Sequence, residues 1–128
     1  MLVKLKTYIF TLVITGTALT VSCTFVPKLN QTNLSVEDKA LKNWVLSYCI
    51  ANTLEAGAAK QDALNTAGAY LEAGNQPIEA YEKATQLIKD YLAKNYTGVT
   101  QGAFNTKKCI DLYESRDLAL LIRRFKKN

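Results

Sequence analysis

The chain has 128 residues, enough for one domain, and its balance of 48% hydrophobic to 21% charged residues is that of a folded protein. It contains no histidine, which excludes Ser-His and Cys-His nucleophile activation and removes the commonest zinc ligand. The net charge is +5, and it falls to +3 once Lys4 and Lys6 are removed with a signal. That excess is too small to indicate a nucleic-acid partner.

Residues 1–23 have the pattern of a secretory signal peptide. Lys4 and Lys6 give a basic start, and residues 8–21 carry no charge. A membrane-spanning helix needs about 20 apolar residues, and this shorter run is further diluted by threonines. We therefore expect export from the cytoplasm, with residues 24–34 as a flexible lead-in to the folded domain.

The end of the signal leaves two alternatives open. Ser22 before Cys23 is the position that a lipoprotein peptidase would use, and lipid on Cys23 would then tether the protein to a membrane. Such sites usually have leucine three residues before the cysteine, where this chain has Thr20. Ordinary cleavage beside Ser22 or Cys23 would instead give plain secretion.

Two cysteines, Cys49 and Cys109, remain in the mature chain. In an oxidising compartment this pair favours one disulfide, although two unpaired core cysteines are the alternative.

Residues 35–128 show helical periodicity without strand alternation, which predicts an all-α bundle of about four to five helices. We expect the first helix to begin after an N-cap at Ser35 and to end near Gly57. Its apolar face comprises Leu41, Trp44, Val45, Tyr48 and Cys49.

A second helix is expected from about Lys60 to Ala73, with Gly74 in a left-handed conformation at its end. Pro77 then favours the start of a third helix, at about residues 77–94. The predicted inward residues are Ala63, Leu64, Ala67 and Leu71 in the second helix and Ile78, Tyr81, Ala84, Thr85, Ile88, Tyr91 and Leu92 in the third.

About eleven residues without helical periodicity follow, before a short fourth helix capped by Thr106 and a fifth capped by Ser115. The expected inward residues are Cys109, Ile110, Leu112 and Tyr113 in the fourth helix and Leu118, Leu121 and Ile122 in the fifth. The connection is long for a small bundle, and loops of this length are disproportionately functional.

The sequence lacks the residue patterns of most catalytic sites. One class remains, which uses paired carboxylates as glycosidases do. The candidate pairs are Glu79 with Glu82, and Asp111 with Glu114. Each pair fits a solvated helix surface equally well, so we expect a binding protein with no enzymatic activity and no cofactor.

The chain contains three stretches in this order: Lys42-Asn43-Trp44-Val45-Leu46-Ser47-Tyr48-Cys49-Ile50, Ala69-Tyr70-Leu71-Glu72-Ala73-Gly74-Asn75-Gln76-Pro77-Ile78-Glu79-Ala80-Tyr81 and Phe104-Asn105-Thr106-Lys107-Lys108-Cys109-Ile110-Asp111-Leu112-Tyr113. Together they resemble the fourth family of type VI secretion amidase immunity proteins. The resemblance covers about residues 40–125.

This resemblance implies a periplasmic homodimer that inhibits a cognate amidase effector delivered by a neighbouring cell, in a heterotetramer with it. The effector would be a papain-like cysteine peptidase that cuts peptidoglycan between D-glutamate and diaminopimelate. The resemblance also implies a bridge between Cys49 and Cys109. An exported helical adaptor or lipoprotein, binding another envelope component, is the competing hypothesis.

In the family, a protruding loop enters the active-site cleft while a helix of the other subunit supports the contact. The candidate loop is Tyr96, Thr97, Gly98, Val99, Thr100, Gln101, Gly102 and Phe104. Its glycines allow close approach and its polar groups offer hydrogen bonds without charge. The alternative is a merely long connection. The candidate second contact is Glu79, Glu82 and Lys83 on the third helix.

Overall fold

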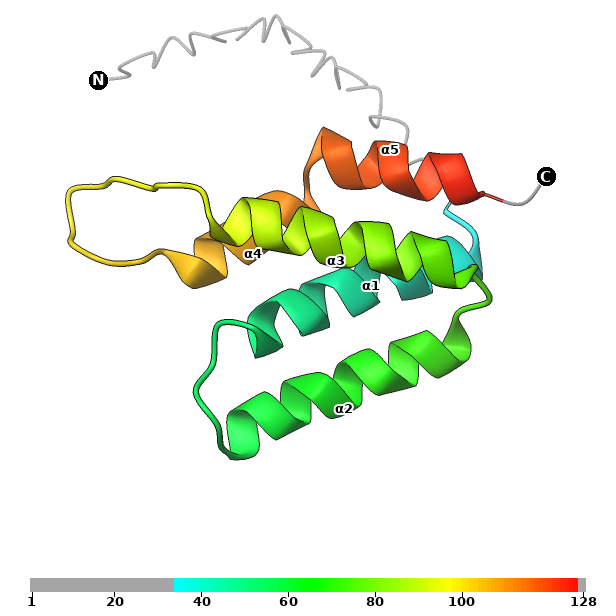
Figure 1. The fold of residues 1–128 in the computed structure, drawn as a ribbon, viewed down its shortest axis with the longest axis horizontal. Coiled ribbons are helices and arrows are strands. Elements are labelled where there is room, and N and C mark those ends of the chain that lie inside the picture. Colours follow the sequence, from blue (N-terminus) through cyan, green and yellow to red (C-terminus); the bar gives the residue numbers. More distant parts are fainter. Residues whose placement is uncertain (1–33, 127–128) are drawn as a thin grey trace, which may run out of the picture. The chain divides into compact units, whose positions relative to one another are not determined.

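The computed structural model describes residues 34–126 and shows five α-helices and no strand among them (Figure 1). The helices are α1 (Val36–Ala51), α2 (Ala58–Ala73), α3 (Ile78–Leu92), α4 (Asn105–Tyr113) and α5 (Arg116–Phe125). The all-α prediction is confirmed. The predicted signal at residues 1–23 and nearly all of the lead-in lie outside the described residues. Within them, no helix has the length and hydropathy needed to cross a membrane.

Helix α1 is the centre of the bundle, because it packs against each of the other four helices. Its first turn is closed by a capping box, in which the Asp38 N–H donates to Ser35 Oγ at 3.1 Å and Ser35 N–H donates to Asp38 Oδ2 at 3.4 Å. Gln76 Nε2 donates to the other Asp38 oxygen at 3.2 Å. This buried carboxylate therefore ties the turn between α2 and α3 to the start of α1.

The core is built from one face of each helix. Trp44 stacks on Tyr48 with ring centroids 4.9 Å apart and meets Tyr81 edge-on at 5.1 Å. The buried residues of the core cluster are Leu41, Trp44, Val45, Cys49, Ala67, Ala80, Tyr81, Ala84, Ile88, Tyr91, Cys109, Leu112, Leu118 and Ile122. Periodicity in the sequence predicted most of these positions.

A disulfide joins Cys49 in α1 to Cys109 in α4, and both residues are fully buried. This settles the alternative of two free cysteines in favour of the bridge. The two cysteines are 60 residues apart, so on the chain-entropy model the closure stabilises the fold by about 4 kcal/mol. The bridge also fixes α4, which begins directly after the long connection.

Helix α1 ends at Ala51, six residues before the predicted end near Gly57. Two side chains terminate it by bonding carbonyl groups of its last turn. Asn52 Nδ2 donates to the Tyr48 oxygen at 2.7 Å, and Thr53 Oγ1 donates to the Ile50 oxygen at 2.8 Å. Local polar competition for these carbonyls therefore overrode the helical pattern.

Three predicted core residues are exposed: Leu71 at 44%, Ile78 at 64% and Ile110 at 52%. Leu71 lies on α2, which contacts α1 alone, so only a narrow stripe of that helix is covered. Ile78 is the first residue of α3. On the short α4, burial of Cys109 and Leu112 turns Ile110 outward.

Two predicted caps were also wrong. Gly74 has an extended backbone (φ −86°, ψ 154°) rather than a left-handed one. A side chain there is excluded by space, since a Cβ would collide with the Tyr81 hydroxyl. Helix α4 begins at Asn105 after Phe104, not after Thr106, and no side chain bonds its first turn. The cap at Ser115 is confirmed, since its hydroxyl accepts from the Leu118 N–H at 3.1 Å.

Candidate functional site

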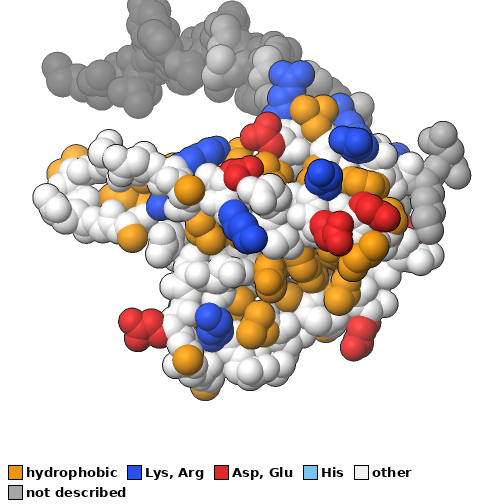
Figure 2. Space-filling model, viewed as in Figure 1, with side chains coloured by type: hydrophobic (Ala, Val, Ile, Leu, Met, Phe, Trp, Pro, Cys, Tyr) orange, Lys and Arg blue, Asp and Glu red, His pale blue; other side chains and the backbone are white. Residues whose placement is uncertain are grey.

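The connection between α3 and α4 projects beyond the ends of the helices (Figure 1). Residues 95–104 carry no charged side chain, and the projecting tip is correspondingly free of red and blue in Figure 2. Val99 stands fully exposed at the tip, and Thr97, Thr100 and Gln101 are exposed beside it. The segment proposed from the sequence is thus an uncharged, accessible loop.

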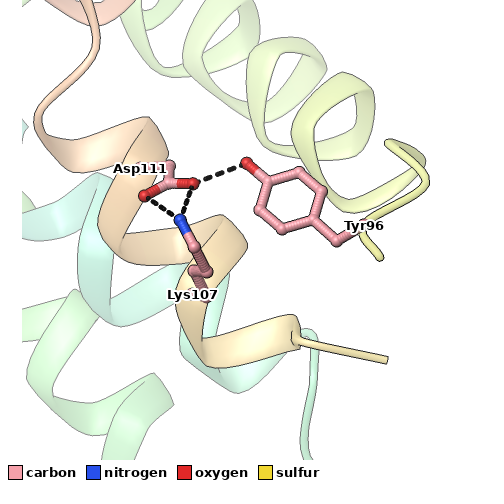
Figure 3. Close-up of polar contacts among 3 residues, drawn as sticks. All are labelled: Tyr96, Lys107 and Asp111. Carbon is pink, nitrogen blue, oxygen red and sulfur yellow. Dashed lines mark hydrogen bonds and ion pairs between the residues drawn. The ribbon is translucent and has the colours of Figure 1, made fainter. Parts of the chain in front are cut away.

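The base of the loop is held by a cluster of three side chains (Figure 3). The Tyr96 hydroxyl donates to Asp111 Oδ2 at 2.7 Å. Lys107, one helical turn before Asp111 on α4, donates to both oxygens of the same carboxylate, at 3.0 Å and 2.7 Å. A residue of the loop is therefore attached to the helix that follows it.

These contacts shift the pKa values of Asp111 and Tyr96 in opposite directions. The hydrogen bond from Lys107, followed by the one from Tyr96, lowers the pKa of Asp111 from its ordinary 3.8. The bond to Asp111 raises the pKa of Tyr96 from its ordinary 10.0. At neutral pH the cluster consequently holds one carboxylate, one ammonium and one neutral phenol.

A hydrogen bond from α4 to the end of α3 also holds the two ends of the loop together. Lys108 is 8% exposed, and its ammonium donates to the Leu92 carbonyl at 2.9 Å. Leu92 is the last residue of α3, where orphan carbonyls favour a cation. The ammonium groups of Lys107 and Lys108 also lie 5.3 Å and 5.8 Å from the centre of the Tyr96 ring.

Phe104 closes the far end of the loop. Its backbone is left-handed (φ 52°, ψ 31°), the one positive φ of a non-glycine residue among residues 34–126. Its ring covers Gly98, where a Cβ would come within 2.9 Å of the ring atom Cζ. Gly98 therefore allows the two sides of the loop to meet. The space around Gly102 is open, so packing does not require glycine there.

The residues predicted as a second contact with the effector lie far from the loop. Glu79, Glu82 and Lys83 are exposed on the first half of α3, whereas the loop follows the last residue of that helix. At about 1.5 Å rise per residue, Glu79 lies roughly 20 Å from the helix end. The structure does not bring these residues and the loop of the same chain into one site.

A groove runs between α3 and α5. Leu87, Leu120, Leu121 and Phe125 contribute apolar lining, with Gln86 beside them. The Tyr91 hydroxyl donates to Asp117 at 3.0 Å, which sets the end of α3 beside the start of α5. The two helices are antiparallel, so basic Lys83 and Arg124 line one end of the groove and acidic Asp90 and Asp117 the other.

The two carboxylate pairs considered from the sequence do not form an acid–base site. Asp111 bonds Lys107 and Tyr96, and its pKa is lowered, whereas a general acid needs a raised one. Glu114 lies 3.8 Å from Lys42. Glu79 and Glu82 are solvated on α3. In residues 34–126, no group of three metal-ligating side chains is close enough to hold an ion.

Lys107, Lys108 and Asp111 support the loop, a role that was not predicted from the sequence. The spacing of four between Lys107 and Asp111 was a visible signal for an ion pair on a helix. Nothing in the sequence indicated that Tyr96, 15 residues before Asp111, bonds the same carboxylate.

The described residues thus form a disulfide-bonded helical bundle with a braced, uncharged loop. The family model for type VI secretion system amidase immunity proteins, Tai4, matches residues 39–122. The chain therefore belongs to the Tai4 family, whose members are immunity proteins rather than enzymes.

Solved structures agree with this assignment. A chain of the effector–immunity system Tae4/Tai4 from Salmonella typhimurium is 39% identical, with 73% of this chain and 93% of that chain covered and a TM-score of 0.67. A chain of the Tae4–Tai4 complex from Enterobacter cloacae is 31% identical, with 67% and 88% covered and a TM-score of 0.61. A chain from Serratia marcescens, from work on type VI-secreted toxins and self-resistance proteins, is 28% identical, with 73% and 77% covered and a TM-score of 0.66. No curated protein sequence matched.

Proposed function

We propose that the loop at residues 96–104 enters the active-site cleft of a cognate amidase effector and blocks the entry of substrate. The observation that carries this proposal is an uncharged loop, braced on both sides, that projects from the bundle of an amidase immunity protein. Similar chains are found in complexes of Tae4 with Tai4 from Enterobacter cloacae, and in one that pairs a Salmonella typhimurium effector with that immunity protein. Those complexes support an amidase as the partner.

The composition of the loop suits insertion into a narrow cleft. Burying a charge without a partner is costly, and the loop has no charge to bury. Thr97, Thr100 and Gln101 offer donors and acceptors to the walls of a cleft, while Val99 offers an apolar tip. Blocking a cleft in this way requires no nucleophile or base from the inhibitor.

The target amidase would cut peptidoglycan between D-glutamate and diaminopimelate, so the inhibitor must act in the periplasm. The predicted signal peptide at residues 1–23 supplies the export, and a buried disulfide suits an oxidising compartment. Plain secretion and lipid attachment at Cys23 differ in the mass of the mature protein. A single mass spectrum therefore distinguishes them.

We also propose a homodimer, which would form a heterotetramer with the effector. The groove between α3 and α5 supports it, because a two-fold axis perpendicular to the groove would set the basic end of one copy, Lys83 and Arg124, against the acidic end of the other. The separation of Glu79 and Glu82 from the loop of the same chain also fits a contact made by the partner subunit's α3. Sedimentation of the purified chain tests this association.

The test of the loop is a charge placed at its tip. We expect Val99→Asp to weaken inhibition of the cognate amidase by at least about tenfold, because the carboxylate would be buried in the cleft. Its stability should change by less than about 0.5 kcal/mol, since Val99 is fully exposed. Val36→Asp, at an exposed valine on α1, is the matched control and should inhibit as the wild type does. Equal inhibition by both variants would remove the loop from the mechanism.

A further inference from the structure

The hydrogen bond between Tyr96 and Asp111 does not belong to the packing of the core. Both residues are outside the buried cluster, and neither joins two helices. An isolated Lys107–Asp111 pair would be an ordinary contact on a helix surface. The Tyr96 side chain gives this pair a second role. It extends from the loop to α4 and donates a hydrogen bond to the carboxylate that Lys107 orients (Figure 3).

The rest of the loop lacks internal support of this kind. No backbone hydrogen bond joins any two of residues 95–103. Three contacts hold residues 96–104 and their ends: the Tyr96 bond, the Lys108 bond to the Leu92 carbonyl, and the Phe104 ring over Gly98. Before this segment, Lys94 lies over the Tyr91 ring of α3, with its Nζ 3.1 Å from the ring centre. Of the three contacts, the Tyr96 bond is the one that attaches a side chain of the loop itself to a helix through a charged group.

We propose that Asp111 is a positioning residue for inhibition: by holding the Tyr96 hydroxyl, it keeps the free loop in the conformation that the amidase cleft accepts. The proposal rests on the proposed function of the loop. Its consequence is quantitative, since the apparent affinity of a binding loop falls in proportion to the fraction of molecules in the competent conformation. Lys107 serves Asp111 by fixing the direction of its carboxylate.

This role predicts a kinetic signature. When the competent state is selected from a mobile loop, the association rate falls with its population while the dissociation rate of the formed complex is unchanged. A residue that merely stabilises the fold would change the melting temperature instead. A residue that contacts the amidase directly would raise the dissociation rate.

The test compares Tyr96→Phe, which removes one hydroxyl, with Tyr113→Phe as a matched control. Tyr113 is on α4, and its hydroxyl donates to Asn43 on α1 at 3.3 Å, away from the loop. Two measurements are made: backbone order parameters of residues 97–103 in the free protein by nitrogen-15 relaxation, and association and dissociation rates with the cognate amidase. Asp111→Asn is a second variant that weakens the same contact.

We expect Tyr96→Phe and Asp111→Asn to lower the loop order parameters from the rigid range, about 0.85, towards 0.6 or below. The association rate should fall by about fivefold with little change in dissociation, as the loss of a preformed state requires. Tyr113→Phe should match the wild type in both measurements.

An unchanged association rate in both loop variants would overturn the proposal, whether or not loop motion increases, because order parameters report picosecond-to-nanosecond motion alone. In that case, loss of binding by Val99→Asp would leave the proposed function standing. If Val99→Asp also binds as the wild type does, the proposed function fails instead, and with it the assignment of Asp111 to inhibition.

Discussion

Asp38 and Lys108 are the two charged side chains that the described residues bury, at 1% and 8% exposure. Each bonds backbone or side-chain groups at the end of a helix. Asp38 closes the first turn of α1, and Lys108 bonds the last carbonyl of α3. Buried charge is tolerated only where such partners exist. In this bundle the buried charges therefore mark the points where one segment is attached to another.

The exposed cluster at the base of the loop gives a prediction for pH. A carboxyl with a lowered pKa, such as Asp111, stabilises the folded state above its unfolded pKa, ordinarily 3.8, and stops doing so as pH falls through its folded pKa. The raised pKa of Tyr96 has the opposite sign, so its contribution is present below 10.0 and is lost as pH rises through the folded value.

The order of the loop should consequently be constant between about pH 5 and pH 9 and should fall at both extremes. Chemical shifts of the amides of residues 97–103, followed by NMR across the pH range, measure it. Tyr96→Phe should lack the alkaline transition. A loop transition near neutral pH in the wild type would contradict this account of the cluster.

Helix α2 is held in the bundle by a single, extensive contact with α1. It contacts α1 alone, and only Ala67 of its residues is buried. Gly68 within α2 and Gly74 directly after it differ in surroundings. Gly68 has open space where a Cβ would lie, whereas at Gly74 a Cβ would meet the Tyr81 hydroxyl and lie 3.2 Å from the Tyr70 carbonyl oxygen.

Alanine at these two positions should therefore have opposite effects. Gly68→Ala should raise the free energy of unfolding by about 0.5–1 kcal/mol, because alanine restricts the unfolded chain and favours a helix. Gly74→Ala should lower it by about 1–3 kcal/mol, through displacement of the buried Tyr81 side chain. Thermal unfolding checks both, at about 4–8 °C per kcal/mol for a domain of this size. Shifts of the same sign in both variants would be inconsistent with this packing.

The fold could be predicted from the sequence wherever a helix is long and its apolar face periodic, as in α3. The prediction was wrong where a short polar residue competes for the backbone, as Asn52 does, and where a helix such as α2 has a neighbour on one side only. The position of the loop was predictable because a gap in periodicity is local information. The contact of Tyr96 with Asp111 was not, since it depends on how α4 returns past α3.

For the whole molecule, a stable bundle presents a small, uncharged loop and directs it outward. The disulfide holds α1 against α4, α4 holds the base of the loop through Asp111 and Lys107, and Lys108 connects α4 to the end of α3. Rigid support of this kind reduces the ordering cost of binding. The contacts at the base of the loop thus connect the segment proposed to meet the amidase to the disulfide-bonded bundle.

The central claim is that this chain inhibits an amidase by occupying its cleft. The most direct measurement is the peptidoglycan-cleaving activity of the cognate amidase, titrated with the purified, disulfide-bonded chain. Cleavage should fall to the background level near one chain per amidase, and Val99→Asp should shift the titration to at least about tenfold higher concentration. Full cleavage in the presence of excess folded chain would contradict the account.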